Sequence, residues 1–157
     1  RMNPHRLTPY AALAVLALGF AAPSRAAELS GTQTLASPHD FAALVAKLEA
    51  AVTEHKMAVV ARASASQGAA GRGVKIPGNA VIMVFRNDFA VRMLEASVSA
   101  GIEAPLRFYV TETADGKASL TWRAPSAIFA PYGSVPLDAM ARELDPIFAA
   151  IAHDAVR

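Results

Sequence analysis

Apolar residues recur at helical spacing in two stretches of the chain, each of which predicts an amphipathic helix, and cap residues predict a further helix between them. We expect the first helix to begin at Ser37, an N-cap residue followed by proline at the first helical position. Its apolar face is formed by Phe41, Leu44, Val45, Leu48 and Val52. A second helix is predicted over residues 87–100. Asn87 or Asp88 would cap it, and Gly101 would end it in a left-handed conformation.

The third helix is predicted at the C-terminal end, after a loop at residues 125–136 that is marked by proline and glycine. Its apolar residues are Leu137, Met140, Leu144, Ile147, Phe148 and Ile151. Pro146 removes one helical hydrogen bond, so we expect a kink or a new helical start there, with Asp145 as its cap.

Strands are predicted where apolar residues alternate or run without a break. Residues 57–61 form a short β-type run, and the apolar run at residues 80–85 is typical of a central strand buried on both faces. Residues 106–111 and 118–123 alternate on either side of a tight Asp-Gly turn, which predicts a β-hairpin. The small residues at 64–78 indicate a short helix or a loop. The elements predict one small α+β domain over residues 27–157, with an antiparallel sheet and helices packed on one face.

Residues 1–26 have the pattern of a secretory signal peptide. Arginines flank an uncharged apolar run at residues 11–22, and Ser24 and Ala26 are small residues suited to a cleavage site. The run is too short for a bilayer core of ~30 Å, which takes ~20 residues to cross. We expect cleavage after Ala26 and export, most simply to a bacterial periplasm, with no stable membrane insertion. An uncleaved anchor helix is the alternative.

Removal of this segment changes the charge of the chain. The whole chain has 15 basic and 13 acidic residues, a net charge of +2 and a pI near 9.2. Three of the arginines lie within residues 1–26, so the mature chain keeps 12 of the 15 basic residues and all 13 acidic ones, a net charge of −1. Electrostatics therefore gives no reason to expect nucleic acid or an anionic membrane as a partner.

The ordered set of segments resembles the family named domain of unknown function 302, DUF302. The resemblance covers about residues 35–155, and the segments that carry it are 59–62, 81–87, 102–112, Asp115-Gly116 and 121–125. It implies a small α+β domain with the topology of the TATA-box-binding-protein repeat. It also implies a homodimer, and a biochemical activity that is not established.

The chain departs from the family pattern at three places. Many relatives carry an Asp-His pair where this chain has Ser64-Ala65, so any chemistry or metal binding by that pair is lost here. Relatives tend to have Gly-Asn-Pro after the central strand, and only Asn87 matches. Many also have glycine at the end of the first helix, where Lys56 stands, which predicts a strained or differently closed helix end.

No familiar catalytic pattern stands out in the sequence. The Ser64–Gly68 stretch lacks the first glycine of a nucleophile elbow, and the glycine-rich residues 68–73 are typical of a flexible turn. Cysteine is absent, which excludes a thiolate nucleophile and Cys-ligated metal. The mature chain's histidines, His39, His55 and His153, are isolated, and its methionines, Met57, Met83, Met93 and Met140, fit core packing. We therefore predict no catalytic residue, no metal and no cofactor.

Glu112 is the candidate site residue with the clearest physical argument. Because side chains alternate along a strand, Glu112 falls on the same, apolar side as Leu106, Phe108 and Val110, at the strand end. A carboxylate there needs a partner, and the candidates are Arg107, Arg123 and Asn87. One interpretation is a structural ion pair at the sheet edge or a dimer seam. The other is a ligand-binding site formed by Glu112, Arg107 and Asn87. The exposed row of Arg107, Tyr109 and Arg123 is too small for a nucleic-acid interface.

Two functions follow from these patterns. The first is a periplasmic, non-catalytic binding or accessory module that dimerises through its sheet or its C-terminal helix. The alternative is a small enzyme or stress-response factor that binds a small molecule or a metal in a pocket near Glu112.

Overall fold

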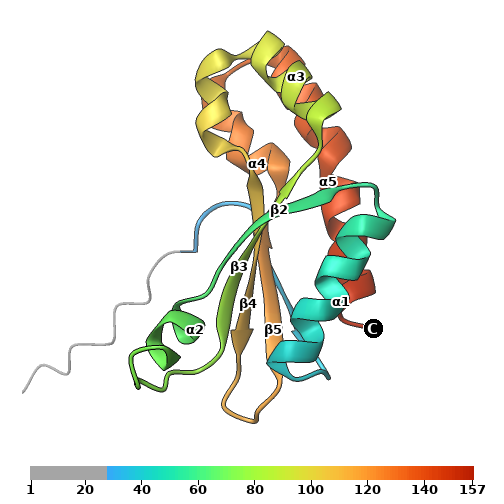
Figure 1. Cartoon of the computed structure of the whole chain (residues 1–157). Coiled ribbons are helices and arrows are strands. Elements are labelled where there is room, and N and C mark those ends of the chain that lie inside the picture. Colours follow the sequence, from blue (N-terminus) through green and yellow to red (C-terminus); the bar gives the residue numbers. More distant parts are fainter. Residues whose placement is uncertain (1–27) are drawn as a thin grey trace, which may run out of the picture.

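The computed structural model describes residues 28–157, and the predicted signal peptide and its cleavage site lie outside the described residues. A five-stranded antiparallel sheet forms the middle of the domain (Figure 1). Its strand order is β1-β5-β4-β3-β2, which places β4 in the centre and makes β1 and β2 the two edges. The strands are β1 (Thr32–Ser37), β2 (Ala58–Ala63), β3 (Asn79–Phe85), β4 (Leu106–Glu112) and β5 (Ala118–Arg123).

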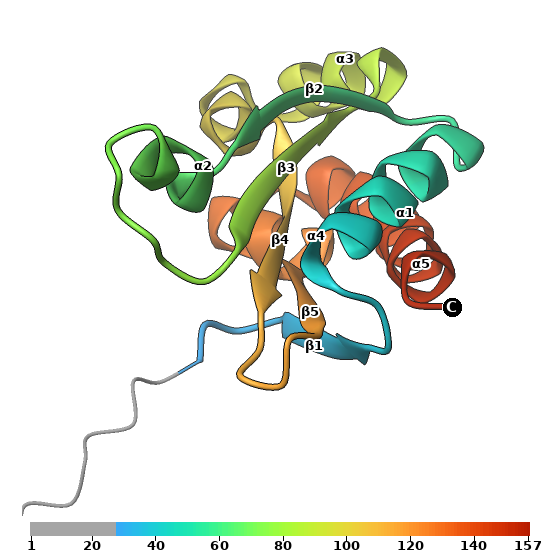
Figure 2. The same cartoon turned by 60° about the horizontal axis from the view of Figure 1, so that its bottom comes forward.

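The long helices lie together on one face of this sheet. Figure 2 shows α1 and α5 side by side on that face, and α2 stands apart beyond the sheet. The helices α3 and α4 pack against α5 at one end of the molecule. The helices are α1 (Phe41–Glu54), α2 (Ala65–Ala70), α3 (Asn87–Ala96), α4 (Pro125–Phe129) and α5 (Val135–Ala155), with 3-10 helices η1 (Val98–Glu103) and η2 (Ala130–Tyr132). The predicted α+β class, with helices on one face of an antiparallel sheet, is confirmed.

The core lies between the sheet and the two long helices. Leu106, Phe108 and Val110 point into it from β4, as their alternation predicts. The Phe108 ring stacks on Phe148 of α5 with its centroid 4.9 Å away, and lies 6.2 Å from the Trp122 ring of β5. The predicted hairpin between β4 and β5 is confirmed, and its turn uses Gly116 at a φ of 78°.

The prediction that residues 80–85 are buried on both faces is wrong. In β3, Ala80, Ile82 and Val84 are buried, whereas Val81 and Met83 are only half-buried on the opposite face. The reason is that α1 and α5 cover one face of the sheet and leave the other open. The strand is interior to the sheet, but β4 occupies the central position.

The start of the first helix also differs from the prediction. Residues 32–37 form β1, which the apolar pattern missed, and Ser37 is its last residue. The Ser37 Oγ accepts a hydrogen bond from the His39 backbone N–H at 3.1 Å. The helix begins at Phe41, and the cap is Asp40, whose Oδ1 accepts from the Ala43 N–H at 2.8 Å. Because β1 pairs with β5 up to its last residue, the chain must turn before a helix can begin.

Gly101 does not end a helix in the left-handed conformation. The helix α3 ends at Ala96, and Gly101 lies inside η1 without a positive φ. A Cβ at this position would lie 3.1 Å from the Leu94 Cδ2. The glycine therefore serves the close approach of η1 to α3.

The C-terminal helix continues through Pro146 without a new start. Asp145 is not a cap for it, because its Oδ1 accepts a hydrogen bond from the Ser126 N–H at 2.9 Å. Ser126 lies in the first turn of α4, a short helix within the predicted loop at residues 125–136. Asp145 thus satisfies a free N–H of α4 and ties that helix to α5.

The end of α1 carries the strain that the family pattern predicts. Lys56 adopts a φ of 58°, the left-handed region that favours glycine. Its N–H donates to the Thr53 carbonyl at 3.0 Å, and the next residue, Met57, is buried. The exposed lysine therefore holds an unfavourable backbone conformation so that the chain can turn from α1 into β2.

We expect Lys56→Gly to stabilise the fold, because glycine adopts this conformation without a Cβ clash. The gain should be about 1 kcal/mol in the free energy of unfolding, or roughly 3–6 °C in Tm. Chemical and thermal denaturation measure both. The matched control is Lys47→Gly inside α1, which should lower stability by about 1 kcal/mol. Destabilisation by both substitutions would contradict the strain at Lys56.

Candidate functional site

The structure does not bring the three predicted site residues together. Because β3 and β4 are antiparallel, Asn87, which follows β3, and Arg107, near the start of β4, belong to the same end of the sheet. Glu112 is the last residue of β4, five positions from Arg107 and therefore roughly 16 Å away along the strand. Arg107 also lies on the face of the sheet that the helices leave open, whereas Glu112, an even number of positions from Phe108, belongs to the face that the helices cover. Glu112 therefore belongs to a site without the other two.

The partner of Glu112 is a backbone amide. Its Oε2 accepts a hydrogen bond from the Gly78 N–H at 2.6 Å, and its own N–H donates to the Gly78 carbonyl at 2.7 Å. The predicted pairing with Arg107, Arg123 or Asn87 is therefore wrong. Glu112 is exposed, because β4 extends past the core at this end and its last side chain meets the returning chain before β3.

Gly78 is held from its other side by the first residue of α1. A Cβ at Gly78 would lie 2.7 Å from the Phe41 Cγ, closer than side chains approach. Only glycine fits between the Phe41 ring and the Glu112 carboxylate. The start of α1, the end of β4 and the segment before β3 are thus packed against one another at this point.

A shallow polar hollow of about 460 Å³ opens beside Glu112, at the α2 end of the sheet seen in Figure 1. It contains a basic side chain, Arg62, and an acidic one, Glu112. The nearest acid to Arg62 is Glu49 of α1, whose Oε1 lies 3.9 Å from Nη1. The residues that line the hollow are Phe41, Arg62, Ser64, Ser66, Gln67, Ile76, Gly78 and Glu112.

The two serines of the hollow hold the backbone in place. The Ser64 Oγ caps α2 by accepting from the Gln67 N–H at 3.1 Å, and it donates to the Asn79 carbonyl at 2.7 Å. The Ser66 Oγ accepts from the Asn79 N–H at 3.1 Å and lies 3.0 Å from the Ser64 Oγ. Both hydroxyls are therefore committed to joining α2 to the start of β3.

The sequence reasoning missed Arg62 and Gln67 as site residues. Arg62 ends the segment 59–62 that carries the family resemblance, and this was the available signal. Gln67 had no signal, because its place depends on how α2 folds back toward β3.

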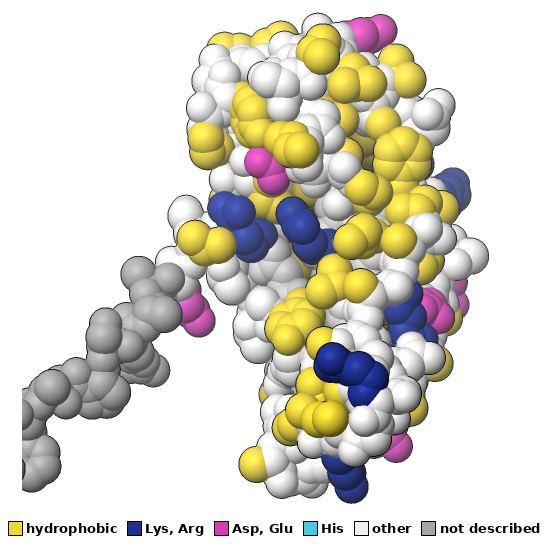
Figure 3. Space-filling model, turned by 60° about the vertical axis from the view of Figure 1, so that its left-hand side comes forward, with side chains coloured by type: hydrophobic (Ala, Val, Ile, Leu, Met, Phe, Trp, Pro, Cys, Tyr) yellow, Lys and Arg dark blue, Asp and Glu magenta, His cyan; other side chains and the backbone are white. Residues whose placement is uncertain are grey.

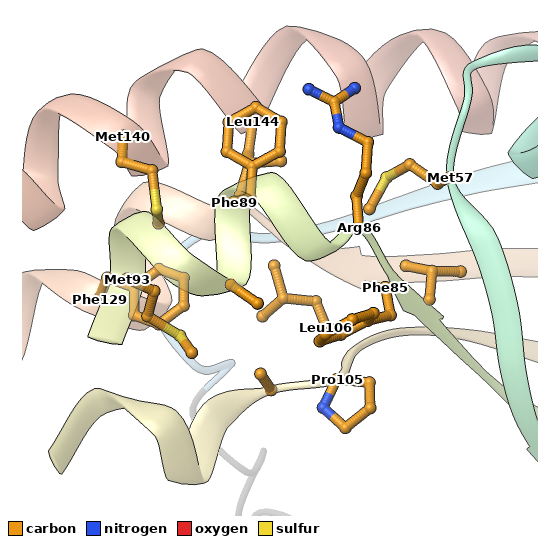
Figure 4. Close-up of a pocket in the computed structure, with 13 residues that line it drawn as sticks. Met57, Phe85, Arg86, Phe89, Met93, Pro105, Leu106, Phe129, Met140 and Leu144 are labelled. Carbon is orange, nitrogen blue, oxygen red and sulfur yellow. The ribbon is translucent and has the colours of Figure 1, made fainter. Parts of the chain in front are cut away.

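A second space lies at the other end of the sheet, and it is apolar. It measures about 30 Å³, room for about two waters, and is bordered by α3, α4, α5 and the adjoining ends of β3 and β4. Figure 4 shows Met93, Phe129 and Met140 on one side of it and Arg86 at its rim. The Arg86 guanidinium lies 4.2 Å from the Phe89 ring centroid, and its hydrogen bond to Asp88 holds the pKa of that carboxyl below its usual value. The small volume indicates a packing gap of the core.

The histidines are used at the ends of α1 and α5. The His39 Nε2 lies 2.9 Å from the Arg157 carbonyl, and the His55 Nε2 lies 2.8 Å from the Asp154 Oδ2. The hydrogen bond to His55 is the main cause that lowers the pKa of Asp154. Within residues 28–157, no three His, Asp or Glu side chains gather as metal ligands would. None of the helices in this range has the length and apolar character that a bilayer crossing needs.

The sequence model of the family described as "Domain of unknown function DUF302" matches residues 33–151. The chain belongs to the DUF302 family. Among solved structures, it is similar to an uncharacterized conserved DUF302 protein from Bacillus stearothermophilus, whose crystal structure superposes with a TM-score of 0.73. The two chains are 16% identical, and the match covers 82% of this chain and 99% of the other. This likeness shows that the two share a fold. Among curated proteins, none matches the chain.

We expect Glu112→Ala to loosen the segment before β3. The Gly78 N–H would lose its charged acceptor, which should lower the free energy of unfolding by about 1–2 kcal/mol. Chemical denaturation measures this loss, and amide hydrogen exchange at Gly78 should become faster. Glu95→Ala, an exposed glutamate on α3, is the matched control and should change stability by less than about 0.5 kcal/mol. Equal effects of the two substitutions would contradict the role of the Gly78 contact.

Proposed function

We propose that this DUF302 protein is an exported, non-catalytic binding module that holds a small polar molecule in the hollow between Arg62 and Glu112. The observation that carries the proposal is the placement of opposite charges in one hollow. Arg62 contributes a guanidinium, and Glu112 contributes a carboxylate whose Oε2 alone is engaged, by Gly78. An anionic group of a ligand would face Arg62, and an amino or other donor group would face Glu112.

The size and walls of the hollow also favour a small ligand. About 460 Å³ lies within the range of ~300–1,000 Å³ typical of small-molecule sites. The Phe41 and Ile76 side chains add apolar wall, and the Gln67 amide adds a donor and an acceptor. We therefore infer a zwitterion of the size of a free amino acid as the ligand class.

The hydrogen bonds of the Ser64 and Ser66 hydroxyls to backbone groups favour a binding function over a catalytic one. A serine nucleophile needs a free Oγ within reach of a base. Ser64 and Ser66 instead use their hydroxyls to hold Asn79 and the start of α2. The small-enzyme alternative would have to use these same hydroxyls or bring its reactive group from outside the hollow.

Export is supported by the n-region, the apolar run and the small residues before Ala27. Native mass spectrometry of protein purified from an exporting cell tests location and ligand together. We expect a chain that begins at Ala27 and that carries a small retained mass. The retained mass should disappear in Arg62→Gln and in Glu112→Gln, because each removes one of the two charges.

Glu112→Gln keeps an acceptor oxygen for the Gly78 N–H, so its fold should persist, as circular dichroism can check. The matched control is Glu95→Gln, which should keep the retained mass. A retained mass unchanged in both hollow variants would overturn the site, and a chain that still carries residues 1–26 would overturn export.

We further propose that the module is a homodimer. Leu94, Val98, Ile102 and Val135 are exposed hydrophobic side chains on α3, η1 and the first residue of the C-terminal helix, and Val98, Ile102 and Val135 are each more than three-quarters exposed. Figure 3 shows hydrophobic side chains gathered at this end of the molecule. Exposed apolar groups that lie near one another favour association, because contact removes them from water.

Light scattering coupled to size-exclusion chromatography tests the dimer. We expect the mass of two chains at micromolar concentration, and a shift to one chain in Ile102→Asp, which places a charge in the contact. Leu29→Asp introduces the same charge at an exposed leucine before β1, outside α3, η1 and α5, and should leave the dimer intact. A wild-type monomer, or a dimer that Ile102→Asp leaves unchanged, would contradict this surface.

A further inference from the structure

The face of the sheet that the helices leave open carries two arginines side by side. Phe108 of β4 and Trp122 of β5 are paired across the two strands. Arg107 and Arg123 lie one position beyond that pair, on neighbouring antiparallel strands and on the open face. Directly opposite positions bring Cβ atoms to within about 5 Å. Figure 3 shows Lys and Arg side chains gathered in the middle of this face.

No carboxylate within the described residues lies at ion-pair distance from either Arg107 or Arg123. The Arg123 Nε makes one hydrogen bond, to the Ser30 carbonyl at 3.3 Å. The open-face positions of the five strands hold only neutral and basic side chains between residues 32 and 123. Like charges directly opposite each other destabilise a sheet, so the fold keeps this pair at a cost.

Apolar and aromatic surface adjoins the arginines. On the side of β4 away from β5, Arg107 is paired with Met83 of β3, and Tyr109 is paired with Val81 of β3. Tyr109 is 42% exposed, so its ring is accessible beside Arg107, two positions along β4. The patch therefore places two guanidinium groups next to the apolar surface of Tyr109, Met83 and Val81.

A second copy of the chain does not suit this face. A two-fold contact is made by the same patch on both subunits, so it would bring two Arg107–Arg123 pairs together without a carboxylate between them. Repulsion among four guanidinium groups removed from water opposes such a contact. Charge complementarity instead requires an anionic occupant.

We propose that the open face of the sheet is a second binding site, for a small organic anion. Arg107 and Arg123 bind its carboxylate or other oxyanion, since guanidinium groups match that geometry with two parallel hydrogen bonds. The apolar body of the ligand lies over Tyr109, Met83 and Val81. The site is separate from the hollow at Glu112, which lies at the α2 end of the molecule and contains none of these residues.

Nuclear magnetic resonance titration of the purified chain with benzoate tests the proposal. Benzoate has one carboxylate and one flat apolar ring, and neutral benzamide has the same shape without the charge. We expect saturable shifts of the amide signals of residues 81–83, 107–109 and 121–123 with benzoate. Benzamide should give shifts at least about tenfold smaller at the same concentration, and added sodium chloride should weaken the benzoate binding.

Arg107→Gln and Arg123→Gln should each weaken benzoate binding about tenfold or more, because one guanidinium is lost. Both side chains are at the surface, so the variants should fold, and unchanged amide spectra elsewhere verify this. Arg142→Gln, an exposed arginine on α5, removes the same charge from the opposite side and should bind as wild type. Equal shifts from benzamide, or equal binding by the Arg107→Gln and Arg142→Gln variants, would overturn the site.

Discussion

The stacking of Phe108 on Phe148 joins the central strand to the long C-terminal helix, and the rest of the architecture depends on it. Phe108 is fully buried, and its ring also meets Trp122 of the neighbouring strand. Because side chains on a strand alternate, fixing Phe108 inward fixes Arg107 and Tyr109 outward. The packing of one face thus determines which groups the other face displays. A one-residue shift of register would exchange them, and burial of the arginines would prevent the fold.

The sequence predicts the parts of this protein that depend on local periodicity. The alternation of β4 and β5 and the apolar stripe of α1 are found where the pattern placed them, and the absence of glycine at Lys56 correctly indicated a strained turn. The missed strand β1 is short and mostly polar, and it is held by pairing with β5 far along the chain. The continuity of α5 through Pro146 likewise depends on its packing along the domain, which local propensity does not contain.

In the candidate site too, local pattern predicted some features, whereas others depend on contacts between distant parts of the chain. The expectation that Glu112 needs a partner followed from the parity of one strand, and the structure supplies one. The identity of that partner, Gly78, could not follow from the sequence, because it depends on how the chain returns from α2 to β3. Arg62 and Glu112 come from the ends of different strands and line the same hollow only because β2, β3 and β4 are neighbours in the sheet. The strand order brings such residues together, and local sequence patterns do not contain the strand order. They can therefore single out individual site residues but not the group that these form.

The position of β1 at the edge beside β5 has a consequence for how the protein folds. Its partner lies roughly 80–90 positions further along the chain, whereas β3, β4 and β5 are separated by much shorter stretches, the longest of which holds α3 and η1. Closing the longer loop is the entropically harder step, so we expect the pairing of β3, β4 and β5 to form first and β1 to join last. Substitutions in β1 then speed unfolding and leave the folding rate nearly unchanged. Because β1 precedes all the other strands in the chain and pairs last, chain order and folding order are opposite at this edge.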